Sequence, residues 1–312
     1  MRTIDIIVPC YNEEDNIEAF FRAAEEAKNS IGDCTFNYIF VDDGSSDGTL
    51  EKIKALGNAG YISFSRNFGK EAAMYAGLKA SAEGDSDYAV IIDADLQHPP
   101  ALIKDMVEIL EETGCDSVAA RRVSRKGEPI IRSIFARLFY KIMNRFSEIH
   151  LADGVVDFRI MRKPMVKAIA GMPERCRFSK GLFQWVGFDT RWIEFENVRR
   201  MSGESRWTVW GLTKYAIEGF VDFAASPLKA AGVAGSLIAA GSLIYLLVEI
   251  IKTLVMGKDT PGYASTICLI LFFGGVIIAM LGIIGEYIGR MYIETKGRPV
   301  YVEKESNIEN HK

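Results

Sequence analysis

The sequence lacks several patterns by which metal and redox sites are usually identified. Its 312 residues include only 3 histidines, which are not spaced as metal ligands, and 5 cysteines without a Cys-x-x-Cys pair. The cysteines are Cys10, Cys34, Cys115, Cys176 and Cys268. We therefore expect reduced thiols in a cytoplasmic domain and no zinc. The first residues lack a basic segment followed by a long apolar one, so Thr3–Val8 is expected to be a strand and not a signal peptide.

Glycine is missing where a dinucleotide site would need it. The loop that follows the first expected strand, Pro9–Glu14, contains none, which argues against a Gly-rich dinucleotide-binding turn. Gly44 and Gly48 follow the second expected strand, but no Gly-Lys-Ser/Thr comes after them, which excludes a Walker phosphate loop. The net charge of −4 gives no reason to expect nucleic acid, although basic residues cluster in 121–145 and 191–206.

Charged residues are absent from two long stretches near the C-terminus. None occurs in residues 230–248 or 261–285, and each stretch is long enough to cross about 30 Å of hydrocarbon. Within residues 226–290 we therefore expect two transmembrane helices, at about 229–253 and 261–287. A buried core helix could imitate one such run, but two in tandem favour a membrane hairpin. Residues 291–312 would then form a cytoplasmic tail, without fixed structure after Lys304.

Short apolar runs alternate with helical patterns in residues 1–225. The expected strands include Thr3–Val8, Tyr38–Val41, Tyr61–Phe64, Ala89–Ile92 and Ser117–Ala120. Asn12, with the two glutamates that follow it, is expected to start the first helix. This alternation predicts an α/β domain with a mostly parallel sheet, whose ligands gather beyond the carboxyl ends of the strands. Asp42, Arg66, Asp93 and Arg121 fall at such ends.

Two aspartates and a glutamine follow the fourth expected strand. In an extended chain Asp93, Asp95 and Gln97 would direct their oxygens to one side. Hard oxygen ligands at this spacing suit Mg²⁺ or Mn²⁺, with phosphate oxygens completing the shell. The alternative is that one aspartate merely caps the helix that Pro99 and Pro100 open. The pattern alone fits both interpretations.

Two further segments have one broad apolar or aromatic face. Residues 129–147 carry arginines and lysines away from that face, and residues 207–223 lead directly into the first expected span. Both are predicted to be helices in the membrane interface, with cations toward lipid phosphate. A core helix with a basic solvated face remains the alternative for 129–147.

Four ordered motifs carry a family resemblance. They are Val8-Pro9-Cys10-Tyr11-Asn12-Glu13-Glu14, Val41-Asp42-Asp43-Gly44-Ser45, Asp93-Ala94-Asp95-Leu96-Gln97-His98-Pro99-Pro100 and Asp157-Phe158-Arg159. The chain resembles family 2 glycosyltransferases and, more narrowly, polyprenyl-phosphate glycosyltransferases. The resemblance implies a Rossmann-like GT-A domain over residues 1–225, acting with inversion. It also implies Mg²⁺ or Mn²⁺ as cofactor, and a nucleotide-diphosphate sugar, polyprenyl phosphate, the lipid bilayer and a second copy of the chain (a dimer or tetramer) as partners.

The same resemblance implies roles for individual residues. Pro9, Tyr11, Glu13 and Asp42 would hold the nucleoside, Asp93, Asp95 and Gln97 the metal and diphosphate, and Arg200, Ser205 and Arg206 the diphosphate. Arg121, Arg132 and Lys180 would meet the acceptor phosphate, and Asp157, Asp95 and Arg121 would be the catalytic residues. Arg206 stands where the family pattern has lysine, which keeps the charge but changes its geometry.

The expected function is transfer of a hexose, such as glucose or N-acetylglucosamine, from a UDP-linked donor to undecaprenyl phosphate, for glycosylation of the cell envelope. The protein would be a multi-pass protein of the cell membrane with its catalytic domain in the cytoplasm. Two alternatives stay open. One is transfer to a diacylglycerol or a protein, and the other is a catalytically silent membrane scaffold that senses nucleotide sugars.

Overall fold

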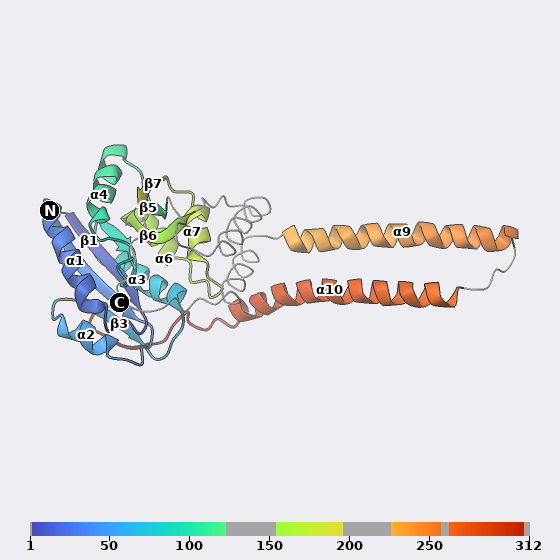
Figure 1. Ribbon diagram of the computed structural model, residues 1–312, viewed down its shortest axis with the longest axis horizontal. Coiled ribbons are helices and arrows are strands. Elements are labelled where there is room, and N and C mark those ends of the chain that lie inside the picture. Colours follow the sequence, from blue (N-terminus) through green and yellow to red (C-terminus); the bar gives the residue numbers. More distant parts are fainter. Residues whose placement is uncertain (1, 123–153, 196–225, 257–261, 309–312) are drawn as a thin grey trace.

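The computed structural model describes residues 2–122, 154–195, 226–256 and 262–308 (Figure 1). Its elements run in the order β1 (Arg2–Cys10), α1 (Ile17–Ser30), β2 (Cys34–Asp42), α2 (Thr49–Ala55), β3 (Gly60–Phe64), α3 (Lys70–Glu83), β4 (Tyr88–Ile91), α4 (Leu102–Thr113), β5 (Ser117–Arg122), β6 (Val155–Arg162), α6 (Lys163–Ala170), α7 (Ser179–Trp185), β7 (Thr190–Phe195), α9 (Ser226–Met256), α10 (Tyr263–Thr295) and β8 (Glu303–Ser306). The predicted interfacial helices at 129–147 and 207–223 lie outside the described residues, as do Arg132, Arg200, Ser205 and Arg206.

The strands form one sheet of eight in the order β7-β5-β6-β4-β1-β2-β3-β8. Strands β3, β2, β1 and β4 pair with one another in parallel, as the alternating sequence predicts. Strand β6 is antiparallel to β4 and β5, and β8 is antiparallel to β3. The predicted α/β fold with a mostly parallel centre is thus confirmed, and antiparallel pairs flank that centre.

Helices cover both faces of the sheet. On one face α1, α2 and α4 pack with buried side chains such as Phe20, Ile53 and Met106. On the other face α3 and α6 pack with Leu78 and Met165, and Phe183 of α7 joins them. Helix α3 lies so close to β1 that a Cβ added at Gly77 would meet Ile7 Cγ2 at 2.3 Å. Because protein cores are close-packed, this contact fixes the middle of α3 over β1.

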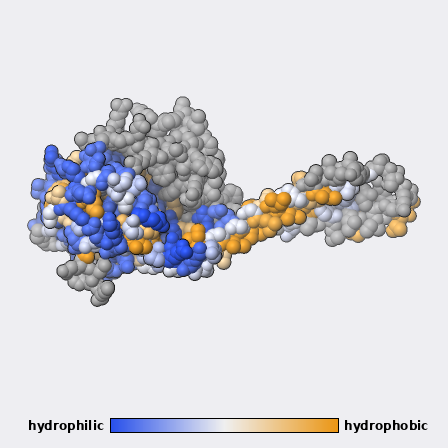
Figure 2. All heavy atoms as spheres, turned by 90° about the horizontal axis from the view of Figure 1, so that it is seen from below, coloured by the Kyte–Doolittle hydropathy of each residue, from blue (hydrophilic) through white to orange (hydrophobic). Residues whose placement is uncertain are grey.

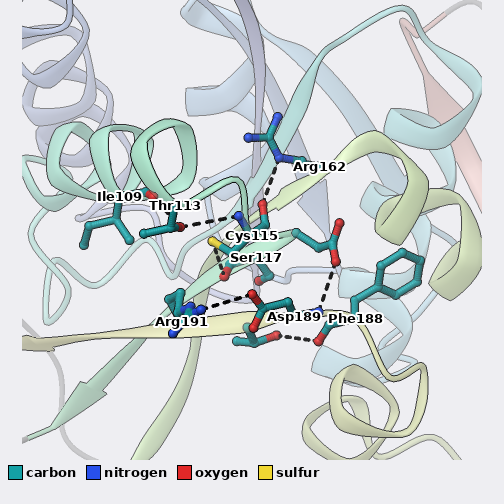
Figure 3. Close-up of polar contacts among 10 residues, drawn as sticks. Ile109, Thr113, Cys115, Ser117, Arg162, Phe188, Asp189 and Arg191 are labelled. Carbon is teal, nitrogen blue, oxygen red and sulfur yellow. Dashed lines mark hydrogen bonds and ion pairs between the residues drawn. The ribbon is translucent and has the colours of Figure 1, made fainter.

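The sheet edge beyond β6 is tied together by polar contacts (Figure 3). The guanidinium of Arg162 donates from Nε to the carbonyl oxygen of Cys115 and from Nη2 to that of Leu110, both at 2.8 Å. The backbone N–H of Asp189 donates to Asp116 Oδ2 at 3.0 Å. These bonds join β6, the α4–β5 connection and the start of β7, so the edge strands keep their register.

The first helix begins later than the sequence predicts. Helix α1 starts at Ile17, and Asn12 has a left-handed backbone with a φ of 53°. The Asn12 side chain accepts a hydrogen bond from the backbone N–H of Ser46 at 2.8 Å. The prediction that Asn12 starts the helix was therefore wrong, because its amide stabilises a link between two loops instead.

Two long helices follow the α/β domain as a hairpin (Figure 1). They contact each other near Gly235, where an added Cβ would lie 3.4 Å from Met280 Sδ. Apolar side chains on their surfaces are open, with Leu254 80% and Ile278 71% exposed, and Figure 2 shows hydrophobic residues along the hairpin. By length and hydropathy, one segment of the described residues, Phe272–Thr295, could cross a membrane.

The tail after the hairpin packs on the domain, and residues 305–308, which the sequence predicted to lack fixed structure, are ordered. It runs back along the domain, where β8 pairs with β3 and the ring of Tyr301 stacks on Phe64 at 4.6 Å (Figure 1). The side chain of Asn307 accepts from the N–H of Tyr61 at 2.6 Å. The prediction failed because the β8 pairing uses backbone groups, so its polar side chains gave no sign of it.

Candidate active site

Acidic groups from several elements meet at the carboxyl ends of the parallel strands. Asp93 and Asp95 come directly after β4, and Asp157 lies near the start of the antiparallel neighbour β6. The register pairs Ile91 of β4 with Arg159 of β6, which brings the end of one strand beside the start of the other. These carboxylates lie at the carboxyl ends of the parallel strands, which is where the sequence predicts that ligands gather.

A lysine joins two of these carboxylates. Lys70, the first residue of α3, has its Nζ 2.6 Å from Asp93 Oδ1 and 2.9 Å from Asp157 Oδ2. The lysine side chain is 41% exposed and that of Asp157 only 17%. Asp157 Oδ1 is buried, and no described group hydrogen-bonds to it. The three side chains therefore form a charged cluster that is open to solvent on the lysine side.

The cluster keeps Lys70 and Asp157 ionised. Burial alone would raise the pKa of Asp157, but the charges of Lys70 and Lys180, with the Lys70 hydrogen bond, hold that pKa well below its usual range. Burial would likewise lower the pKa of Lys70, but attraction to Asp157 and Asp93 keeps it above its ordinary value. Asp157 is thus a fixed negative charge at neutral pH and a poor proton acceptor.

Arg159, two positions after Asp157 on β6, adds a buried positive charge near this cluster. It is fully buried, its Cζ lies 3.6 Å from the centre of the Phe183 ring, and burial lowers its pKa. Neither Nε nor Nη1 of Arg159 has a hydrogen-bond partner among the described residues. The buried guanidinium adds positive charge behind Asp157, two positions away on β6.

The residues after β4 offer a donor set for a divalent cation. Oxygens of Asp93 and Asp95 and a ring nitrogen of His98 all lie within 4.8 Å of one another. The His98 ring packs against Phe158 and Phe195, with centroids 5.8 and 5.4 Å apart, which fixes its position. Two carboxylates with an imidazole fit Mn²⁺, and carboxylates with water fit Mg²⁺, so these residues suit the predicted cofactor.

The path of the chain at this site differs from the extended one that the sequence predicted. Strand β4 ends at Ile91, and Leu96 has a left-handed φ of 56°. The backbone N–H of Gln97 donates to Asp95 Oδ1 at 3.1 Å, which closes a tight turn. The two aspartates therefore come together through a turn, and not because alternate side chains of an extended strand point to one side. The same turn places His98 beside them, a residue for which the sequence analysis predicted no role.

The loops after β1 and β2 are bonded to each other beside this turn. The N–H of Asn12 donates to Ser45 Oγ at 2.9 Å, and the N–H of Glu13 donates to Thr49 Oγ1 at 2.8 Å. Among the predicted nucleoside residues, Pro9 is buried at the end of β1 and Tyr11 is 39% exposed. An exposed ring on a fixed loop can stack on a base.

Asp42 and Asp43 are both buried and serve the loops around them. Asp42 accepts hydrogen bonds from Ser63 Oγ at 2.8 Å and from the N–H of Ser45 at 3.0 Å. Asp43 accepts from the N–H groups of Phe68 and Gly69 at 2.6 and 2.9 Å, and burial raises its pKa to about 6. Asp43 thus fixes the loop that ends at Lys70, a role that the sequence did not reveal.

Two further predicted site residues, Arg121 and Lys180, lie near Asp157 at these strand ends. Arg121, near the end of β5, is partly buried and stands opposite Val155 in the register, two residues before Asp157. Lys180 is in the first turn of α7 and contributes positive charge at Asp157. The structure thus gathers Asp93, Asp95 and Asp157 with basic residues, and it adds Lys70, for which the sequence suggested no role.

Comparison with known proteins identifies the family. The profile of glycosyl transferase family 2 matches residues 5–170, and the profile of the GtrB C-terminal hairpin matches residues 226–291. The chain belongs to glycosyl transferase family 2. The family assignment and the GT-A type of fold that the motifs predicted are confirmed, and the helices α9 and α10 coincide with the matched hairpin.

Several relatives align over nearly the whole chain. The protein of Bacillus subtilis (strain 168) named "Putative glycosyltransferase CsbB" is 44% identical over 98% of this chain and 93% of its own length. The SfII prophage-derived bactoprenol glucosyl transferase of Shigella flexneri is 38% identical over 98% and 99%. Among solved structures, mannosyl-3-phosphoglycerate synthase from Rubrobacter xylanophilus has a TM-score of 0.48 and 16% identity, covering 77% of this chain and 75% of that one.

Proposed function

We propose that this glycosyltransferase moves a hexose from a UDP-linked sugar to undecaprenyl phosphate at the cytoplasmic face of the cell membrane, for glycosylation of the cell envelope. The observation that carries the proposal is the cluster of Asp93, Lys70 and Asp157 in a domain joined to an apolar hairpin. A relative of similar length is named a bactoprenol glucosyl transferase, which supports a polyprenyl phosphate as the acceptor.

The donor side would be formed by the loops after β1, β2 and β4. Tyr11 offers an exposed ring for the base, and Pro9, Glu13 and Asp42 shape the loops around it. Asp93 and Asp95, with His98 or Gln97, would hold Mg²⁺ or Mn²⁺, which neutralises charge on the diphosphate. Arg200, Ser205 and Arg206, outside the described residues, would contact the same diphosphate.

The chemical step would be one direct displacement. An oxygen of the acceptor phosphate forms a bond to the anomeric carbon while the bond to the donor diphosphate breaks, and the electron pair leaves with the nucleoside diphosphate. A phosphate monoester has a second pKa near ~6, so the nucleophile carries no proton that must be removed at pH 7. Asp157 then acts as a charged positioning group, and Arg121, Lys180 and Arg132 bind the acceptor phosphate.

The experiment for this function is a panel of radiolabelled nucleotide sugars offered with undecaprenyl phosphate to the purified full-length protein. We expect one UDP-hexose to give a lipid-soluble product, with a β-linked sugar from an α-linked donor and no sugar attached to the enzyme. Anomeric configuration is read by NMR. Label in diacylglycerol or protein would favour the alternative acceptors, and donor binding without turnover would favour the scaffold.

The hairpin is proposed to cross the membrane and return. The pairing of β8 with β3 supports this, because it keeps the end of the chain on the same side as the catalytic domain. The basic residues that flank the expected spans are Arg199, Arg200, Arg206, Lys214 and Lys229 before the first span and Arg290, Lys296 and Arg298 after the second, against Lys258 in the link. This bias favours a cytoplasmic location for both flanks.

Cysteines placed on the two sides would test this orientation. We expect Thr260→Cys, in the link, to react with a membrane-impermeant maleimide added to intact cells, because the link would lie outside. Lys304→Cys, exposed on β8, is the matched control and should react only after the cells are opened. Labelling of Lys304→Cys in intact cells would contradict the proposed topology.

A further inference from the structure

The C-terminal end of α10 contacts a loop of the catalytic domain through one carboxylate. Glu294 Oε1 accepts hydrogen bonds from the backbone N–H groups of Arg175 and Cys176, at 2.8 and 2.9 Å. Arg175 Nη1 in turn donates to the carbonyl oxygen of Pro299 at 2.9 Å. Bonds to a charged acceptor are stronger than neutral ones, so this contact fixes the 174–176 backbone against the end of the hairpin.

The same loop is held on its other side by buried polar groups. Arg177 is 7% exposed, and its Nη1 donates to the carbonyl oxygen of Met172 at 2.6 Å. Ser179 is fully buried and bonds through both its N–H and its hydroxyl to Glu71, the neighbour of Lys70 at the start of α3. The loop is therefore tied to α10 at one end and to α3 at the other.

The loop leads directly to a residue of the proposed acceptor site. Lys180 follows Ser179 in the first turn of α7, and its charge acts on Asp157. The proposed nucleoside-binding residues, in contrast, lie on the loops after β1 and β2, which are bonded to one another. Movement of this loop would thus affect the acceptor side first.

We propose that Glu294 is a positioning residue for acceptor binding: it holds the 174–180 loop so that Lys180 lies beside Asp157, and it makes the end of the membrane hairpin part of the acceptor site. This inference rests on the proposed function, because it takes the acceptor to be a lipid phosphate. A lipid-anchored substrate arrives along the membrane, and a site built from the hairpin end has a fixed position relative to that surface.

The test compares three variants of the full-length protein in lipid nanodiscs. Glu294→Ala removes the carboxylate oxygen that accepts the two backbone hydrogen bonds, and Glu294→Gln keeps one such oxygen. Glu286→Ala is the matched control, because Glu286 lies two turns earlier on α10, where it is exposed and bonds to Arg290. We expect Glu294→Ala to raise the KM for undecaprenyl phosphate about tenfold, with the Kd for UDP within about twofold of wild type. Glu294→Gln should recover most of the lost affinity.

Hydrogen exchange gives a readout that needs no substrate. We expect the peptide that contains Arg175 and Cys176 to exchange its amide hydrogens faster in Glu294→Ala than in wild type or Glu286→Ala. Unchanged exchange would overturn the inference whatever the enzyme transfers. An equal loss of UDP and acceptor binding, without recovery in Glu294→Gln, would also overturn it, because it would show a general structural role. Failure of the wild-type protein to use undecaprenyl phosphate would instead reject the proposed function.

Discussion

Replacing Asp95 by asparagine is expected to lower sugar transfer by about a thousandfold or more while the fold stays intact. The side chain is 9% exposed and belongs to the group that could bind a cation. An amide keeps the shape but loses the charge that holds a divalent ion against a diphosphate. The carbonyl oxygen of asparagine can still accept the Gln97 N–H, so the turn is preserved.

The matched control is Asp105→Asn, which makes the same change at an exposed position in the first turn of α4. We expect this variant to keep wild-type activity. Thermal unfolding followed by circular dichroism should give the same midpoint for Asp95→Asn as for wild type, and titration calorimetry should show weaker Mn²⁺ binding. Full activity of Asp95→Asn, or of wild type in excess chelator, would falsify the metal-dependent mechanism.

The place of Asp93 and Asp95 at the end of a strand could be predicted from the sequence, because the hydrophobicity pattern shows where a buried strand ends. The apolar run Ala89–Ile92 predicts where β4 ends, and parallel strands place their carboxyl ends together. The shape of the following turn could not be read in this way. It depends on the left-handed backbone at Leu96, a residue type that rarely adopts it.

Contacts between distant segments were also beyond the sequence. Lys70 and Asp157 are 87 positions apart, and their pairing depends on the order β3-β2-β1-β4-β6 in the sheet. The carboxylate of Glu294 bonds to backbone N–H groups, which every residue type except proline offers. No side-chain pattern reports a partner of this kind. The pairing of β8 with β3 is likewise made by backbone groups, so the residues after Lys304 were predicted to lack fixed structure.

The Asn12 prediction shows how two local rules can compete. Asparagine is favoured both as a helix cap and in left-handed turns. The sequence analysis predicted that Asn12 starts the helix. In the structure Asn12 lies in a left-handed turn instead, because Ser45 and Ser46 on the neighbouring loop provide its hydrogen-bond partners. Local preference therefore limited the options at this position, and the contact between two loops decided among them.

Replacing Lys70 by methionine is expected to lower transfer at least about a hundredfold and to change how stability depends on pH. The change removes the ammonium that lies between Asp93 and Asp157, so two carboxylates face each other without a cation. Repulsion and burial then act on Asp157, and among the described residues Lys180 and Arg159 oppose them. Lys79→Met, at an exposed position of the same helix, is the control and should resemble wild type.

The sign of the pH effect follows from the pKa of Asp157. In wild type this pKa lies below its unfolded value, so the ionised group stabilises the fold at pH values above the unfolded pKa. This contribution is lost as the pH falls from the unfolded pKa toward the lower folded pKa. Without Lys70, burial shifts the pKa upward, so protonation on acidification relieves the penalty of the charged form. The stability of Lys70→Met should therefore approach that of wild type as the pH falls from 7 to 4.

Urea unfolding at several pH values would measure this difference. We expect wild type to exceed Lys70→Met by about 1–2 kcal/mol at pH 7, a modest value because the ammonium is 41% exposed. The gap should shrink toward pH 4, whereas Lys79→Met should show no such trend. A stability difference that stays constant with pH would show that Asp157 does not depend on Lys70 for its charge. The basic residues of β6 and α7 would then be the groups that keep Asp157 ionised.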